Sequence, residues 1–133
     1  MILLDTHVLV WMAADERHLG RKTRALIQRH WSAGAVAASA ISFWEVALLQ
    51  ARGRLRLPVP AEQWRAELLD AGLAECALDG ATTVRSADLD GFPEDPADRF
   101  IAATALLTGA TLLTADERLL AIRHRLPRHD ARL

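Results

Sequence analysis

Cysteine is nearly absent from this chain: Cys76 is the only one, so an internal disulfide bond is excluded. We interpret Cys76 as a buried core residue. No apolar run approaches the roughly 18 residues that a membrane-spanning helix needs. The first five residues have neither the basic region nor the long apolar core of a secretory signal. Together these absences predict a cytoplasmic protein with no membrane segment.

The chain has no excess of charge of one sign. Its 16 Lys and Arg residues and 17 Asp and Glu residues give a formal net charge of −1. Overall charge therefore does not indicate a nucleic-acid partner. Lysine is also scarce, because Lys22 is the only one and the other cations are arginines. Arginine suits bidentate phosphate contacts, but GC-rich codon usage produces the same bias, so only its local distribution is informative.

The length of 133 residues, of which 51% are hydrophobic, suits one domain with one core over residues 1–133. Strands are predicted at 2–4, 35–38, 73–78 and 110–113, with a short edge strand in the tail from 125 to 133. Helices are predicted at 6–13, 20–31, 43–52, 61–71, 81–87, 96–108 and 115–122. This alternation predicts an α/β fold with a central parallel sheet and helices on both faces.

Four carboxylates each lie where an apolar run ends and a helix is expected to begin. They are Asp5, Glu45, Asp98 and Asp116. Strand ends and helix starts share one edge of a parallel sheet, and ligands bind there. Two unit charges about 4 Å apart repel by roughly 4 kcal/mol at an effective dielectric of about 20. Because a divalent cation neutralises such a cluster, the four acids predict a metal-dependent hydrolase.

Helix capping is the alternative role for each acid taken singly. Ser42 and Glu45 have the spacing of a capping box, in which the glutamate bonds back to the backbone of the serine. Asp5 has the position of an N-cap. Capping alone would therefore account for these two acids.

The other two acids are not needed as caps if the predicted helix starts are correct. Asp95 is expected to cap the helix that contains Asp98, with proline at its first position. Thr114 and Glu117 are expected to form a capping box that leaves Asp116 without a capping role. These two acids are not needed for capping, and they lie on different elements at the same edge of the sheet. This favours a ligand that the acids share.

Ligands that are all oxygen atoms select a hard cation. No pair of Cys and His residues has the spacing of a zinc site. Mg²⁺ or Mn²⁺ suits carboxylates and water and acts on phosphate substrates. The predicted chemistry is attack of metal-activated water on a phosphodiester.

The segments around the four acids resemble the motifs of the PIN-domain ribonucleases, in particular the VapC toxins of type II toxin–antitoxin pairs. The similar segments are 3–11, 39–46, 95–105 and 112–120. They occur in the family's order over almost the whole chain. The resemblance implies that the four acids are the metal-binding and catalytic residues, with Thr114 and Thr6 as supporting polar residues.

The same resemblance implies a sheet of about five parallel strands, dependence on Mg²⁺ or Mn²⁺, and endoribonuclease activity on an RNA substrate. It also implies a homodimer and a cognate antitoxin. The chain departs from many relatives at Pro93, which stands where they carry a histidine, two residues before the Asp-Pro of the third motif. We expect this change to affect the shape of the loop and the choice of substrate, and none of the four acids.

Arginines near the acids are candidates for contacts with RNA phosphates. Arg52, Arg54 and Arg56 follow the helix that contains Glu45. The alternative for these three is a solvated helix end, where cations match the helix dipole. Arg99, next to Asp98, is a further candidate for phosphate, although we slightly favour a structural role in which it holds a carboxylate in place.

Three other classes share some of these features. A phosphoryl-accepting receiver domain also has an acidic pocket, but it needs a second acid beside Asp5 and a lysine after the last strand, whereas the only lysine is Lys22. A non-catalytic PIN-like interaction module would be expected to lack at least one of the four acids. The alternative of a nuclease acting on DNA stays open, because phosphodiester chemistry alone does not distinguish DNA from RNA.

Overall fold

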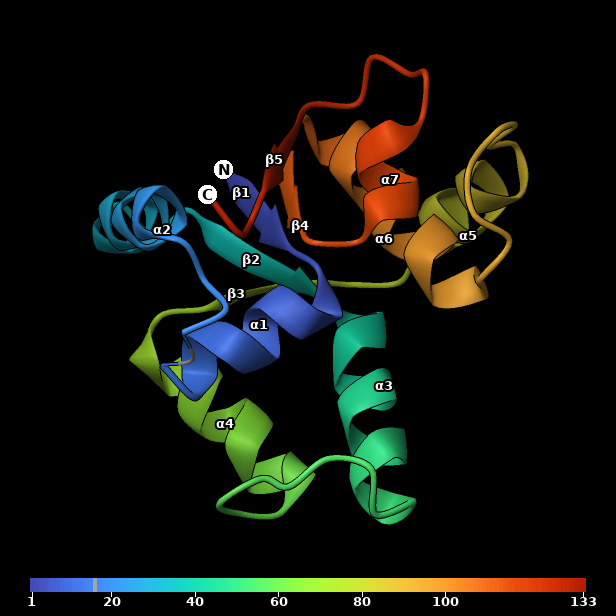
Figure 1. Cartoon of the computed structure of the whole chain (residues 1–133). Coiled ribbons are helices and arrows are strands. Elements are labelled where there is room, and N and C mark those ends of the chain that lie inside the picture. Colours follow the sequence, from blue (N-terminus) through green and yellow to red (C-terminus); the bar gives the residue numbers. More distant parts are fainter. Residues whose placement is uncertain (16) are drawn as a thin grey trace.

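A computed structural model, which describes residues 1–15 and 17–133, contains one sheet of five strands (Figure 1). The strands are β1 (Ile2–Leu4), β2 (Val36–Ser39), β3 (Ala74–Cys76), β4 (Thr111–Thr114) and β5 (Arg128–Asp130). Their order is β3-β2-β1-β4-β5, and every neighbouring pair is parallel. This confirms the predicted parallel sheet, including the edge strand in the C-terminal tail.

The helices also follow the predicted pattern. They are α1 (Thr6–Ala13), α2 (Arg21–Ser32), α3 (Ala40–Ala51), α4 (Ala61–Ala71), α5 (Gly80–Ala87), α6 (Pro96–Thr108) and α7 (Glu117–Ala121). As predicted, Asp95 caps α6. Gly109 ends the helix in the left-handed conformation. In the part of the chain that the structure describes, no helix has the length and hydropathy needed to cross a membrane.

Helix α3 begins before the position predicted for it. Its N-cap is Ser39, the last residue of β2, whose hydroxyl accepts a hydrogen bond from the backbone N–H of Ile41. Ser42 instead lies buried inside the helix. The predicted capping box of Ser42 and Glu45 is therefore wrong, because the chain turns into the helix directly at the end of the strand.

Helix α7 also begins differently from the prediction. Asp116 is its N-cap and accepts a hydrogen bond from the backbone N–H of Arg118 at 2.8 Å. Thr114 belongs to β4, so the capping box predicted for Thr114 and Glu117 does not form. The prediction that Asp116 has no capping role was wrong.

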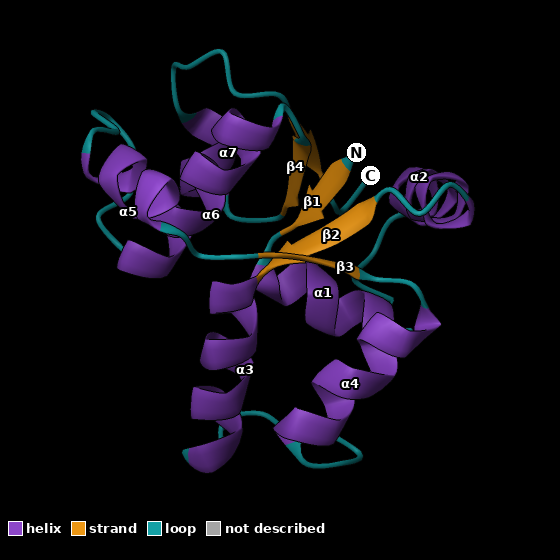
Figure 2. Cartoon of the chain, turned by 180° about the vertical axis from the view of Figure 1, so that it is seen from behind, coloured by secondary structure: helices purple, strands orange, loops and turns teal. Residues whose placement is uncertain are grey.

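Two cores cover the two faces of the sheet, because successive strand residues point to opposite sides. Ile2, Leu4 and Leu113 pack on the side of α1, α2 and α4. Leu3 and Leu112 pack on the side of α6 and α7. Figure 2, which views the molecule from behind, shows the same separation of helices. The expectation of helices on both faces is confirmed.

Cys76 occupies an outer strand, β3, and is only partly buried. Its side chain packs against the core on the α6 side. Partial burial also raises the pKa of the thiol. The prediction of a fully buried core cysteine is therefore wrong, because the edge of the sheet leaves one side of this strand uncovered.

The order in which strands are added to the sheet reverses beside β1, and this reversal positions the acids. After β1 the chain adds β2 and β3 on one side, and it later returns to add β4 and β5 on the other side. Ligands in such sheets bind at the carboxyl ends of the strands that flank the reversal. Asp5 follows β1 and Asp116 follows β4, so the two acids lie on either side of this point.

Candidate active site

Asp5 is the buried centre of the acid cluster, with a relative exposure of 4%. Its Oδ1 accepts a hydrogen bond from the backbone N–H of Thr6 at 2.8 Å, and its Oδ2 accepts one from the hydroxyl of Thr114 at 2.7 Å. Burial raises the pKa of Asp5, although both hydrogen bonds act in the opposite direction. The carboxylate is thus fixed between the start of α1 and the end of β4.

Glu45 reaches the same site from α3 through a bond to α1. The hydroxyl of Thr6 lies 2.5 Å from Glu45 Oε1, to which it donates, and 2.9 Å from the hydroxyl oxygen of Ser42. Burial raises the pKa of Glu45, and the charge of Asp5 adds to the effect. The glutamate is therefore held by Thr6 and takes no part in capping its own helix.

Asp98 comes from the first turn of α6, and its side chain is 14% exposed. Burial raises its pKa to about 7, and the charges of Asp5, Asp95, Asp116 and Glu45 contribute to this rise. The four predicted acids therefore interact electrostatically at one edge of the sheet, as the sequence predicts.

Asp116 is paired with an arginine that the sequence analysis missed. Nη2 of Arg118 lies 3.1 Å from Asp116 Oδ2 and 3.3 Å from Asp98 Oδ2. Burial tends to raise the pKa of Asp116, but the hydrogen bonds from Arg118 outweigh it and the net shift is downward. The sequence holds no short-range signal for the contact with Asp98, because Asp98 and Arg118 are 20 residues apart.

The donor set of this edge fits a divalent cation. The available ligands are carboxylate oxygens, which are the donors that Mg²⁺ and Mn²⁺ prefer. The pKa of Asp98 is raised to about 7 by burial and by the charges of the neighbouring acids, so ionising it in the metal-free protein is costly. Among residues 1–15 and 17–133, no three acidic, histidine or cysteine side chains form a ready-made metal site. A bound cation would therefore draw the carboxylates closer together.

A cavity of about 250 Å³ opens beside two of the acids. Asp5, Asp116 and Ala115 line it together with His7 and Trp11 of α1. The exposed ring of His7 lies near enough to Asp5 to oppose the rise in its pKa. The acid edge is thus accessible from solvent through a space with aromatic walls.

The structure does not bring Arg52, Arg54 and Arg56 to the acids. All three are exposed, and they lie at and beyond the C-terminal end of α3. Glu45 and Arg52 are seven residues apart on this helix, which corresponds to roughly 10 Å along its axis. Their role in binding RNA phosphates stays a prediction.

Arg99 lies near the site but bonds to backbone oxygens. Its Nε donates to the carbonyl of Ser86 at 2.9 Å, and its Nη1 donates to the carbonyl of Pro93 at 3.3 Å. Arg99 thus connects α6 to the end of α5 and to the loop that contains Pro93. Its role is structural, but it bonds to backbone carbonyls and not, as predicted, to a carboxylate.

Comparisons with known proteins agree with this arrangement. The sequence matches the PIN domain family over residues 2–125. It is 35% identical over 130 residues to Ribonuclease VapC22 of Mycobacterium tuberculosis (strain ATCC 25618 / H37Rv), with 95% of each chain covered. This chain belongs to the PIN-domain family of VapC ribonucleases.

Solved structures show the same PIN-domain fold. The DNA-bound VapBC of Salmonella typhimurium is similar with a TM-score of 0.70, 18% identity and 98% of each chain covered. VapBC2 from Rickettsia felis, bound to a DNA fragment from their promoter, is similar with a TM-score of 0.68 and 18% identity over 97% of this chain and 98% of that one. At these identities the likeness concerns the fold alone.

We predict that Asp98→Asn stabilises the metal-free PIN domain at pH 8. The pKa of Asp98 is about 7 in the folded protein and near 3.9 in an unfolded chain. Wild-type protein therefore loses stability as the pH rises from about 4 to 7, and this loss is complete above pH 7. The variant avoids it, with a gain on the order of 1–2 kcal/mol after allowance for partial solvent exposure.

Thermal melts in chelator at pH 5 and pH 8 measure this effect. The gain should be larger at pH 8 than at pH 5. Asp70→Asn, at an exposed position of α4, is the matched control and should change little at either pH. A lower melting temperature for Asp98→Asn at pH 8 would contradict the prediction.

Proposed function

We propose that this VapC-type PIN ribonuclease is an endoribonuclease toxin that hydrolyses RNA phosphodiesters with the help of Mg²⁺ or Mn²⁺. The convergence of four acids from four elements on the edge beside β1 and β4 carries the proposal. Family membership supports it, since the relative with 35% identity is named a ribonuclease. We further propose that residues 1–133 form one domain, that it acts in the cytoplasm, and that a cognate antitoxin inhibits it.

Asp5, Asp98, Asp116 and Glu45 would hold the cation in this proposal. When bound by these residues, a divalent cation would supply an activated water and charge stabilisation for a phosphodiester. Asp5 is oriented in advance by Thr114 and Thr6, so it need not be ordered when the substrate binds. Glu45, which Thr6 holds at this edge, would accept the proton of the attacking water.

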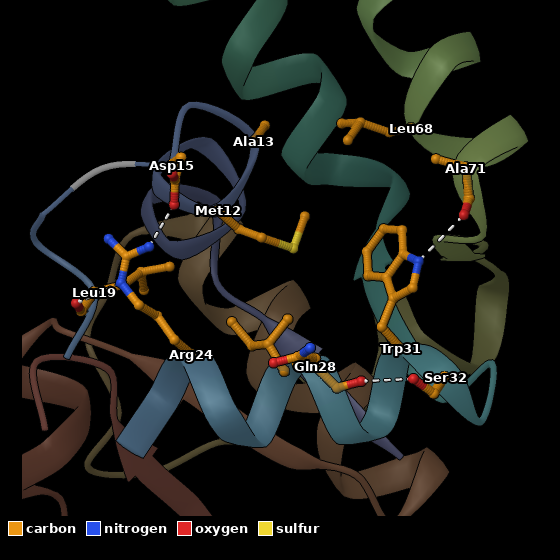
Figure 3. A pocket seen from close by; sticks show the side chains of 11 residues that line it. Met12, Ala13, Asp15, Leu19, Arg24, Gln28, Trp31, Ser32, Leu68 and Ala71 are labelled. Carbon is orange, nitrogen blue, oxygen red and sulfur yellow. Dashed lines mark hydrogen bonds and ion pairs between the residues drawn. The ribbon is translucent and has the colours of Figure 1, made fainter. Parts of the chain in front are cut away.

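An apolar groove supports the proposal of an antitoxin partner. It has a volume of about 460 Å³ and lies between α1, α2 and α4. Figure 3 shows Met12, Leu19, Trp31 and Leu68 around it, with the ion pair of Asp15 and Arg24 at one end. Grooves of this kind accept the apolar face of a helix or an extended segment. The solved relatives named above are VapBC complexes, and one found by the same comparison is described as a toxin-antitoxin complex from Klebsiella pneumoniae.

Helix α1 connects this groove to the acids. Thr6, its first residue, binds Glu45, whereas Met12 and Ala13 at its other end line the groove. An eight-residue helix is roughly 12 Å long, and about four extended residues span that distance. An antitoxin segment held in the groove would therefore reach the acids with a short extension. The homodimer that the family resemblance implies stays a prediction.

We predict that Asp5→Asn, Asp98→Asn and Asp116→Asn each lower RNA cleavage by roughly 100-fold or more, because each removes a charge that orients the cation and the water. The measurement is cleavage of a mixed pool of transfer and ribosomal RNA with Mn²⁺ or Mg²⁺, beside a chelator control. Asp70→Asn again serves as the matched control and should cleave as wild type does.

Discrete cuts that need both the metal and Asp98 would support the proposal. Wild-type activity in any folded site variant would remove that acid from the machinery. Single-stranded DNA of matched sequence, tested in parallel, separates the two nucleic acids. Preferential cutting of the DNA would replace the ribonuclease proposal with the alternative of a DNA nuclease.

We predict that Leu68→Glu weakens binding of the antitoxin at least tenfold, or about 1.4 kcal/mol, because it introduces a charge into the apolar groove. RNA cleavage by the isolated variant should persist. Titration calorimetry with the product of the adjacent upstream reading frame measures the affinity. Val84→Glu, at a position of α5 with 74% exposure, is the control. Equal affinity for both variants would place the antitoxin elsewhere.

A further inference from the structure

The side chain of Arg118 connects two acids from different elements. Its Nη2 lies 3.3 Å from Oδ2 of Asp98 on α6 and 3.1 Å from Oδ2 of Asp116 at the end of β4. The backbone N–H and Nε of the same arginine also bond to Asp116 Oδ1, at 2.8 Å and 3.4 Å. One cationic group thus lies between two of the carboxylates proposed to hold the metal.

We propose that Arg118 is a built-in competitor of the divalent cation, which holds Asp98 and Asp116 in the metal-free protein and must withdraw when the cation binds. The inference rests on the proposed function, because it takes these carboxylates as the metal ligands. A divalent cation needs oxygen ligands at about 2.0–2.2 Å. Both Oδ2 atoms now face the same guanidinium nitrogen, so a shared ion would compete with it for these oxygens. The two positive charges would also repel each other at such a distance.

Little else holds Arg118 in this position. Its side chain is 65% exposed, and its side-chain ion pairs are those with Asp98 and Asp116. The attraction of these two acids therefore has to outweigh the hydration of an exposed guanidinium. When a divalent cation neutralises Asp98 and Asp116, their attraction for Arg118 should become too weak to hold it there.

The structure also provides a place for the withdrawn side chain. Arg118 lines a cavity of about 370 Å³ together with Asp90, Phe92 and His124. Asp90 supplies a carboxylate in this lining and Arg123 supplies a second cation, so the cavity offers the guanidinium space and one acidic group. The arginine can therefore leave the acids by rotation of an exposed side chain, with no rearrangement of the sheet.

This role has two consequences of opposite sign. Removing Arg118 takes away the charge that offsets the repulsion between the acids, so the metal-free protein should become less stable. It also removes the competitor, so the cation should bind more tightly. An ordinary surface ion pair would contribute a little stability and would have no effect on the affinity for a metal.

Arg118→Gln tests both consequences. We expect a lower melting temperature in chelator, together with a dissociation constant for Mn²⁺ that is roughly 3- to 10-fold smaller by calorimetry. Arg65→Gln is the matched control, because Arg65 makes two bonds to Glu75 at 2.7 Å and 2.8 Å away from the acids. Arg65→Gln should leave Mn²⁺ binding unchanged, and its largest expected effect is a lower stability.

Arg118→Lys provides a second variant that keeps the charge and lacks the planar fork. Its affinity for Mn²⁺ should lie between those of wild type and Arg118→Gln. Equal or weaker Mn²⁺ binding by Arg118→Gln, with wild-type binding intact, would overturn the competitor role and leave the metal site standing. If neither protein bound Mn²⁺, both the metal site and the competitor would be overturned.

Discussion

Repulsion among carboxylates at one edge of the sheet is the constraint on which the rest of the site depends. The reversal of strand order beside β1 brings Asp5 and Asp116 to the same crevice. Helices α3 and α6 then add Glu45 and Asp98. The rise of the pKa of Asp98 to about 7 measures the combined cost of burial and of these neighbouring charges. The fold accepts this cost at a position where a cation can relieve it.

The surrounding residues make the cluster tolerable in two ways. Thr6 donates a hydrogen bond to Glu45 and Thr114 donates one to Asp5, and these bonds hold the two carboxylates in place. Arg118 supplies positive charge on the exposed side of the site. Both threonines are buried at element ends, whereas the side chain of Arg118 is 65% exposed. Orientation and charge compensation are thus assigned to different residues.

The sequence predicted the fold more accurately than it predicted the local role of each acid. Periodicity and turn residues located the strands and helices, because each apolar pattern is short-range. The helix caps were harder to predict. Ser39 and Ser42 are both serines, which suit an N-cap, and only the position where β2 ends decides which of them caps α3. The cap of α7 was equally hard to predict, because Thr114 belongs to β4 and donates its hydroxyl to Asp5, which leaves Asp116 as the cap. The N-cap of a helix that follows a strand directly can be predicted only when the end of the strand is known within one residue.

The sequence by itself determined the α/β class, the parallel sheet and the identity of the four acids, because these follow from apolar periodicity and from motifs that are local in the chain. Only the tertiary structure decided what each side chain binds. The bond from Thr6 to Glu45 spans 39 residues, and that from Thr114 to Asp5 spans 109. Arg118 likewise meets Asp98 across 20 residues, between elements that share no local pattern. Contacts of this kind arise when the elements pack, so no short-range signal specifies them.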